Sequence, residues 1–237
     1  MKSPRVLLII PAFNEEKSIK NTLSLVKSSK YDYIVINDGS SDNTEKVLND
    51  IHANYINLCF NLGIGGAVQT GYKYALENNY DIAIQFDADG QHNIDYVNNL
   101  IEPIINNKAD LVIGSCFIDK NLKNKRSSTI RRLGIKFLSK VIFLFSGKHI
   151  YDPTSGFRAI NSKIIYNFAK KYPQEYPEPI SNFEILKYSN FKVKEVPVTM
   201  NKRKAGKSSI HSWKSIYAAF NVLLSIILIS FRRKKHD

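Results

Sequence analysis

The 237-residue chain has the length of one globular domain, and its 43% hydrophobic content excludes a disordered, collagen-like or polytopic membrane protein. The formal net charge of +13 is divided unevenly: residues 1–118 carry 9 Lys+Arg and 14 Asp+Glu, whereas residues 119–237 carry 25 and 7. The basic second half therefore needs a negatively charged partner, such as a nucleic acid, an anionic membrane surface or substrate phosphates.

The first half alternates short apolar runs with segments of helical spacing. Five strands are predicted at Val6–Ile10, Tyr33–Ile36, Tyr55–Cys59, Asp81–Phe86 and Asp110–Gly114. Helices are predicted over 15–28, from Ser41 or Asp42 to about Ile51, up to about Glu77, and over Asn93–Asn106. This alternation predicts an α/β protein with a mostly parallel sheet.

The second half has a different character. Helical spacing predicts helices over 130–145 and 161–171, and Phe191–Val198 is predicted as a late strand. The segment Tyr151–Ala159 is marked by Pro and Gly, and Tyr172–Pro179 contains three prolines. A basic loop is expected over Asn201–Ser212.

Polar loops follow four of the predicted strands. They are Pro11–Glu16, Asn37–Ser41, Asn61–Gly66 and Asp87–Gln91. Ligands of parallel α/β sheets bind beyond the carboxyl ends of the strands. We therefore expect the four loops to form one site.

The sharpest local motif is the acidic pair Asp87 and Asp89, with Gln91 two residues further on. Oxygen ligands of this kind hold Mg²⁺ or Mn²⁺ and leave coordination positions for phosphate. An isolated Asp-x-Asp is also common in solvated turns, but its position beside three other polar loops favours a metal site.

The first two polar loops suit a nucleoside. The carboxylate of Asp38 can accept hydrogen bonds from a base or a ribose. Pro11 provides a rigid turn, Phe13 an apolar wall and Glu15 a polar group. An Asx-turn at Asp38 and a helix start near Asn14 explain the same residues, and both interpretations can hold together.

The ordered set of motifs resembles the inverting family 2 glycosyltransferases, and most closely the branch of dolichyl- and polyprenyl-phosphate sugar synthases. The resemblance covers about residues 5–212. It implies the GT-A fold, with a Rossmann-like sheet and helices on both faces, a UDP- or GDP-sugar donor, and Mg²⁺ or Mn²⁺. The motifs are Pro11–Glu15, Asn37–Ser40, Asn61–Gly63, Asp87–Gln91, Asp152–Ala159 and Arg203–Ser208.

The resemblance also implies roles for single residues. The nucleoside is expected near Pro11, Phe13, Glu15 and Asp38, and the metal near Asp87, Asp89 and Gln91, with Asp87 also close to the ribose. Acceptor binding is expected from Ser155, Arg158 and Lys207, and phosphate closure from Arg203 and Lys207. Tyr151 stands where related mannose synthases often have Arg, and Arg131, Arg132 or Lys148 could replace that phosphate ligand.

Two acceptors remain open. A polyprenyl phosphate, undecaprenyl or dolichyl, is already an anion and needs no strong general base, whereas a saccharide hydroxyl on a lipid-linked glycan needs a carboxylate. Asp152 is the main candidate for that base, ahead of Glu178 and Glu184. We expect a hexosyltransferase acting on polyprenyl phosphate, with cell-wall or surface polysaccharide synthesis on a saccharide hydroxyl as the alternative.

The C-terminal segment is apolar. Ser215–Phe231 contains 17 consecutive uncharged residues, which is the lower limit for a spanning helix, and the basic run Arg232–Lys235 follows. We divide the chain into a catalytic domain, 1–212, and a membrane-associating helix with a basic tail, 213–237. We expect this helix on an anionic surface at the cytoplasmic face of the cell membrane, as a peripheral or monotopic anchor. A spanning helix, packing on the domain, and oligomer formation are the alternatives.

Two other classes fit less well. Nucleic-acid binding is disfavoured, because the acidic loops would repel phosphate in the absence of a metal. A sugar-nucleotide pyrophosphorylase usually needs a Gly-rich basic signature after the first strand, where Pro11–Glu16 is acidic.

Overall fold

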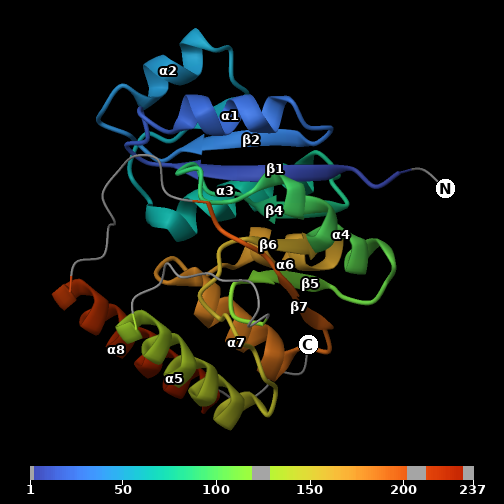
Figure 1. Ribbon diagram of the computed structural model, residues 1–237, viewed down its shortest axis with the longest axis vertical. Coiled ribbons are helices and arrows are strands. Elements are labelled where there is room, and N and C mark those ends of the chain that lie inside the picture. The colour runs from blue at the N-terminus through green and yellow to red at the C-terminus, as the bar shows by residue number, and fades with distance from the viewer. Residues whose placement is uncertain (1–2, 119–128, 202–211, 232–237) are drawn as a thin grey trace.

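The computed structural model describes residues 3–118, 129–201 and 212–231 (Figure 1). Its centre is a seven-stranded sheet in the order β3-β2-β1-β4-β6-β5-β7. Neighbouring strands are parallel, except that β6 runs antiparallel to both β4 and β5. The strands are β1 Val6–Ala12, β2 Asp32–Asn37, β3 Tyr55–Asn57, β4 Ile82–Gln85, β5 Leu111–Ser115, β6 Arg158–Asn161 and β7 Val193–Pro197.

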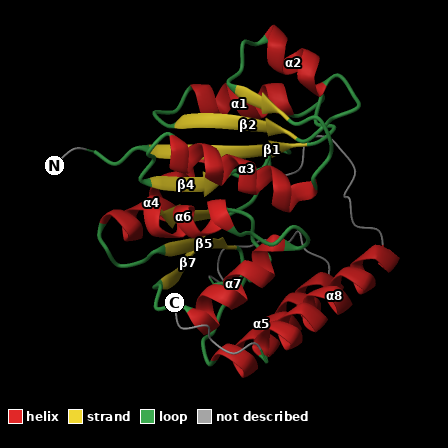
Figure 2. Cartoon of the chain, turned by 180° about the vertical axis from the view of Figure 1, so that it is seen from behind, coloured by secondary structure: helices red, strands yellow, loops and turns green. Residues whose placement is uncertain are grey.

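Helices cover both faces of the sheet (Figures 1 and 2). One core lies between the sheet and α1, α2 and α4; the other contains side chains of α3, α5, α6, α7 and α8. The helices are α1 Ile19–Lys27, α2 Thr44–Asp50, α3 Gly63–Glu77, α4 Val97–Ile105, α5 Thr129–Ser146, α6 Ser162–Lys170, α7 Pro177–Tyr188 and α8 Ser212–Ser230, and a 3₁₀ turn at Ile94–Tyr96 leads into α4.

Strand β1 explains the two-core arrangement. All seven of its residues are buried. Because successive side chains of a strand point to opposite faces, Leu7 and Ile9 enter one core and Leu8 and Ile10 the other. This confirms the prediction of a mostly parallel sheet covered on both faces.

Two elements were not predicted from the sequence. β6 is only four residues long and begins with Arg158, in a segment that its Pro and Gly residues mark as a loop. α7 starts inside the Pro-rich stretch, with Pro177 in its first turn. Proline is tolerated there because the first N–H groups of a helix have no partner within the helix.

The C-terminal helix α8 packs on the rest of the described molecule through one side. Val222 and Ile226 of α8 are buried in the core that also contains Ile142 of α5 and Phe183 of α7. Lys187 Nζ donates a hydrogen bond to the carbonyl of Ser230 at 2.9 Å. The views in Figures 1 and 2 agree that α5 and α8 lie side by side at one end of the molecule. Within the described ranges, none of the helices combines the length and apolar character needed to cross a bilayer.

Candidate active site

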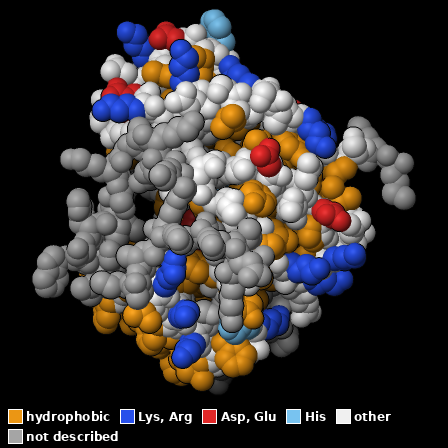
Figure 3. Space-filling model, viewed as in Figure 1, with side chains coloured by type: hydrophobic (Ala, Val, Ile, Leu, Met, Phe, Trp, Pro, Cys, Tyr) orange, Lys and Arg blue, Asp and Glu red, His pale blue; other side chains and the backbone are white. Residues whose placement is uncertain are grey.

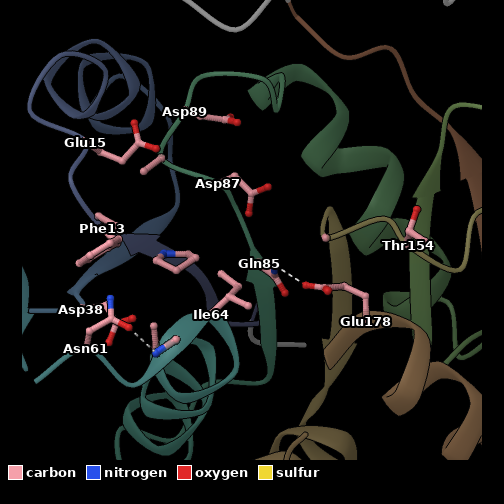
Figure 4. A pocket seen from close by; sticks show the side chains of 16 residues that line it. Phe13, Glu15, Asp38, Asn61, Ile64, Gln85, Asp87, Asp89, Thr154 and Glu178 are labelled. Atoms are coloured by element: carbon pink, nitrogen blue, oxygen red, sulfur yellow. Dashed lines mark hydrogen bonds between the residues drawn. The ribbon is translucent and has the colours of Figure 1, made fainter. Parts of the chain in front are cut away.

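A cavity of about 590 Å³ opens at the carboxyl ends of β1, β2 and β4 (Figure 4). The polar loops after the first four strands all contribute to its wall, as expected from the sheet topology. No Lys or Arg is found among the described lining residues, whereas five carboxylates are: Glu15, Asp38, Asp87, Asp89 and Glu178.

One end of the cavity combines an aromatic surface with a fixed carboxylate. Phe13 is 47% exposed, while Asp38 is buried. The backbone N–H of Leu62 donates to Asp38 Oδ1 at 2.7 Å. Burial raises the pKa of Asp38, and this hydrogen bond partly opposes the rise. Such a surface offers stacking for a flat ring and an oriented acceptor beside it.

Gly39 allows the loops behind Asp38 to approach each other. Its φ of +63° is in the left-handed region, and a Cβ there would lie 2.8 Å from the backbone nitrogen of Asn61. Asn14, also left-handed, accepts the backbone N–H of Ser41 at 2.8 Å on its Oδ1. The loops after β1, β2 and β3 are thereby held together.

A buried histidine orients the acidic motif. His92 Nδ1 accepts the backbone N–H of Asp87 at 2.9 Å, and its Nε2 lies 3.4 Å from Asp87 Oδ2. The imidazole stacks on Phe157 with ring centroids 4.5 Å apart. Because Nδ1 acts as an acceptor, the proton of a neutral ring is on Nε2 and points to the carboxylate. No role was predicted for His92, although a histidine directly after Gln91 of the acidic motif is a signal for such a partner.

The family model described as "Glycosyl transferase family 2" matches residues 7–168, which extend from Leu7 in β1 through β6 and include all four polar loops. The chain belongs to glycosyltransferase family 2. It is therefore an enzyme of the glycosyltransferase class.

Two curated relatives match along most of their length. A UDP-N-acetylglucosamine–dolichyl-phosphate N-acetylglucosaminyltransferase from Methanococcus voltae is 35% identical over 84% of this chain and 86% of its own. An undecaprenyl-phosphate mannosyltransferase from Micrococcus luteus is 28% identical, with 87% of both chains covered.

The fold is shared with a solved structure. Glucosyl-3-phosphoglycerate synthase from Mycobacterium tuberculosis, in complex with Mn²⁺, UDP-glucose and phosphoglyceric acid, superimposes with a TM-score of 0.67. The match covers 98% of this chain and 81% of that one at 17% identity, which supports the shared GT-A fold alone.

The acidic motif of this family 2 enzyme fits a divalent cation shared with a ligand. Asp87 and Asp89 both line the cavity, and Asp89 Oδ1 accepts the backbone N–H of Gln91 at 2.9 Å. Gln91 itself is not among the lining residues. In the described part of the chain, no cluster of three or more His, Cys, Asp or Glu could enclose a metal. The two carboxylates therefore suit a cation whose other ligands come from diphosphate and water.

Asp152 and Ser155 lie beside the cavity but do not line it. Asp152 is 5% exposed and accepts the hydroxyl of Thr154 at 3.2 Å. Ser155 donates its hydroxyl to the carbonyl of Gly114 at 2.6 Å. Burial raises the pKa of the nearby Glu195, and the carboxylate of Asp152 raises it further. Both predicted residues therefore hold the segment in place here, and their predicted substrate roles stay predictions.

Arg158 is placed differently from the acceptor contact that the resemblance implies. Its side chain is completely buried and does not reach the cavity. Nη1 donates to Ser181 Oγ at 2.9 Å and to Asn182 Oδ1 at 3.3 Å, while Nη2 bonds the hydroxyl of Tyr172. The guanidinium is used to hold α7, because β6 directs it into the core beneath that helix.

The remaining predicted residues divide into two groups. Arg203 and Lys207 lie outside the described residues, as does the side chain of Arg131. Of the weaker base candidates, Glu178 lines the cavity and Glu184 does not. Gln85, which also lines it, was missed, although a polar residue at the end of a buried apolar strand is a signal for such a position.

Proposed function

We propose that this chain transfers a hexose from a nucleoside diphosphate sugar to a polyprenyl phosphate at the cytoplasmic face of the cell membrane. The observation that carries the proposal is the acidic cavity at the carboxyl edge of the sheet. Five carboxylates would repel a diphosphate unless a cation lies between them, and this arrangement suits a metal-assisted nucleotide-sugar site. The relatives from M. voltae and M. luteus, both named for lipid-phosphate acceptors, support the acceptor.

The proposed reaction needs two things from the described residues. Phe13 and Asp38 would bind and orient the nucleoside, and Asp87 and Asp89 would hold Mg²⁺ or Mn²⁺. A bound cation would neutralise charge on the leaving diphosphate. The acceptor phosphate is already an anion, so no side chain has to remove a proton from it.

An exposed apolar surface supports the membrane location. We define the α5–α8 surface by its exposed apolar residues, which include Phe137 (55%) and Leu144 (76%) on α5 and Phe220 (62%) and Leu228 (64%) on α8. Figure 3 shows hydrophobic and basic side chains interleaved along the lower edge, where Figure 1 places α5. Such a mixture fits a helix pair lying on anionic lipid.

A transfer assay tests the proposal. Undecaprenyl phosphate is offered with radiolabelled UDP-N-acetylglucosamine, UDP-glucose and GDP-mannose in the presence of Mn²⁺ or Mg²⁺, and lipid products are analysed by chromatography. We expect a labelled lipid monophosphate sugar with one donor, and its loss in EDTA. Transfer to a lipid-linked glycan, with none to the lipid phosphate, would assign the acceptor to a saccharide hydroxyl instead.

A further inference from the structure

One wall of the cavity takes no part in the proposed binding of nucleoside and cation. Gln85, Gly156 and Glu178 line it, and Figure 4 shows Glu178 on the opposite side from Phe13 and Asp38. Asp87 lies between the two sides in the same view. A nucleoside at Phe13 with its diphosphate at Asp87 would therefore direct the next group of the donor toward this wall.

The wall presents hydrogen-bond acceptors. Gln85 is 1% exposed, and its Nε2 donates to Glu178 Oε1 at 3.1 Å. Because a carboxylate only accepts hydrogen bonds, the amide nitrogen must face Glu178 and the amide oxygen must face elsewhere. Gln85 Oε1 has no hydrogen-bond partner among the described residues. A buried acceptor without a partner is costly, so its presence at a cavity wall points to a ligand that donates.

The fold holds these acceptors rigidly. Glu178 is in the first turn of α7, which follows Tyr176 in a left-handed conformation with φ of +47°. The buried Arg158 bonds Ser181 and Asn182 in the next turn, and Asn182 Nδ2 donates to the carbonyl of Pro153 at 3.1 Å. One guanidinium thus fixes both α7 and the segment that leads to Gly156. Strained backbone and buried support of this kind are typical of binding sites.

We propose that Glu178 and Gln85 form the subsite that binds hydroxyl or amide N–H groups of the donor hexose. This inference rests on the proposed function and deepens it. The carboxylate of Glu178 would repel both the diphosphate and the acceptor phosphate, which leaves the uncharged, donor-rich sugar as its ligand. Carboxylates accept two hydrogen bonds from neighbouring hydroxyls, so the pair selects hexoses by the positions of those groups.

Binding measurements test the subsite without an acceptor. Affinities of the full chain for UDP-N-acetylglucosamine, UDP-glucose and GDP-mannose, and for UDP and GDP, are measured by calorimetry with Mn²⁺. We expect Glu178→Gln to weaken the preferred nucleotide sugar by about 10-fold or more, because hydrogen bonds to a charged group are lost. Affinity for the matching nucleoside diphosphate should change by less than about two-fold.

A matched control lies three residues away. Glu175 is exposed and does not line the cavity, so Glu175→Gln removes the same charge from the same segment and should leave both affinities unchanged. The second variant is Gly156→Ala, whose Cβ would lie 2.8 Å from Gln85 Nε2 and displace the amide. We expect Gly156→Ala to weaken the nucleotide sugar and to leave the affinity for the nucleoside diphosphate nearly unchanged. Gly134→Ala on α5, whose Cβ would meet nothing within 4 Å, should change neither affinity.

The outcomes separate this inference from the proposed function. Equal weakening of nucleotide sugar and nucleoside diphosphate by Glu178→Gln would overturn the subsite. Unchanged affinities with abolished transfer would assign Glu178 as a general base and would also overturn it. The expected binding pattern without any lipid product would support the subsite and contradict the polyprenyl phosphate acceptor. Failure of the wild-type chain to bind any nucleotide sugar would overturn both.

Discussion

At the scale of single residues, the acidic motif is held by a side chain that does not line the cavity. His92 bonds Asp87 through backbone and side chain and is stacked on Phe157. A partner of this kind fixes the orientation of a metal ligand and usually affects metal affinity by about 10- to 100-fold. We therefore propose a positioning role for His92 beside Asp87.

Replacing His92 by Phe keeps the ring stack and removes both polar contacts. We expect His92→Phe to weaken Mn²⁺ binding in the presence of UDP by about 10-fold, because Asp87 loses its orientation. Electron paramagnetic resonance of free Mn²⁺ measures this directly. The exposed His149→Phe is the control, and equal Mn²⁺ affinities in the two variants would contradict the positioning role.

Asp89 gives the simplest test of the cation site. Asp89→Ala should lower transfer by at least about 100-fold, because one of the two carboxylates beside the proposed cation is lost. Initial rates with saturating donor measure the loss, with thermal unfolding to show that the fold is kept. The exposed Asp95→Ala serves as control, and activity of Asp89→Ala near wild type would exclude the metal role.

Glu195 predicts a pH dependence of stability. Its pKa is raised above the ordinary 4.5 by burial, so the folded state binds its proton more tightly than the unfolded chain does. The free energy of unfolding therefore loses this contribution as pH rises from about 4.5 through the raised value. Urea titrations between pH 4 and 7 should show that the free energy of unfolding declines less with pH in Glu195→Gln than in wild type. Parallel declines in the two proteins would refute the contribution of Glu195.

At the scale of elements, α7 supplies Glu178 to the cavity wall, and the position of α7 depends on its contacts with β6. Arg158 connects them, so Arg158→Ala leaves Ser181 and Asn182 without their donor. We expect a loss of about 3 kcal/mol in the free energy of unfolding, typical of a truncated buried charged group. Arg158→Lys should rescue only part of it, because one ammonium cannot reproduce the fork of the guanidinium.

Chemical denaturation measures this prediction, and a loss below about 0.5 kcal/mol would contradict it. Stability measurements also distinguish a structural role of Arg158 from a role in acceptor contact. A role of Arg158 in acceptor contact alone would weaken acceptor use and leave stability unchanged. The buried position instead predicts that stability falls and that donor and acceptor use decline together.

The elements also show which patterns could be predicted from the sequence. β1 is recognisable because an uninterrupted apolar run is buried on both faces. β6 is not, since Arg158 pairs with Gln85 of β4 and Ile113 of β5, which lie 73 and 45 residues earlier in the sequence. α7 begins with prolines that commonly end helices, and its contacts with the buried Arg158 outweigh local propensity.

At the scale of the whole molecule, the acidic and basic halves of the sequence supply two different surfaces. The acidic first half supplies four of the five carboxylates of the cavity, and α5, in the basic half, carries Arg132, Lys136 and Lys140 beside exposed apolar side chains. The molecule therefore presents an acidic site that suits the proposed cation and nucleotide, and a basic, apolar end that suits anionic lipid.

Membrane binding is best tested by surface substitutions. Deleting 213–237 would also remove Val222 and Ile226 from the core, so it would disturb the fold. Phe220→Asn with Leu228→Asn should lower sedimentation with phosphatidylglycerol vesicles several-fold, because exposed apolar area is lost from the α5–α8 surface. Leu25→Asn with Leu76→Asn, on α1 and α3, is the control pair, and equal effects of the two pairs would reject the surface.

The sequence by itself determined the alternation of strands and helices, the loops that form the cavity and the acidic motif, because each depends on neighbours a few residues apart. Only the tertiary structure decided that Arg158 is buried and that Glu178 reaches the cavity. Both residues belong to polar or Pro-rich segments of similar appearance in the sequence. Their opposite positions follow from the pairing of β6 between β4 and β5 and from the packing of α7, which direct one side chain into the core and the other into the site.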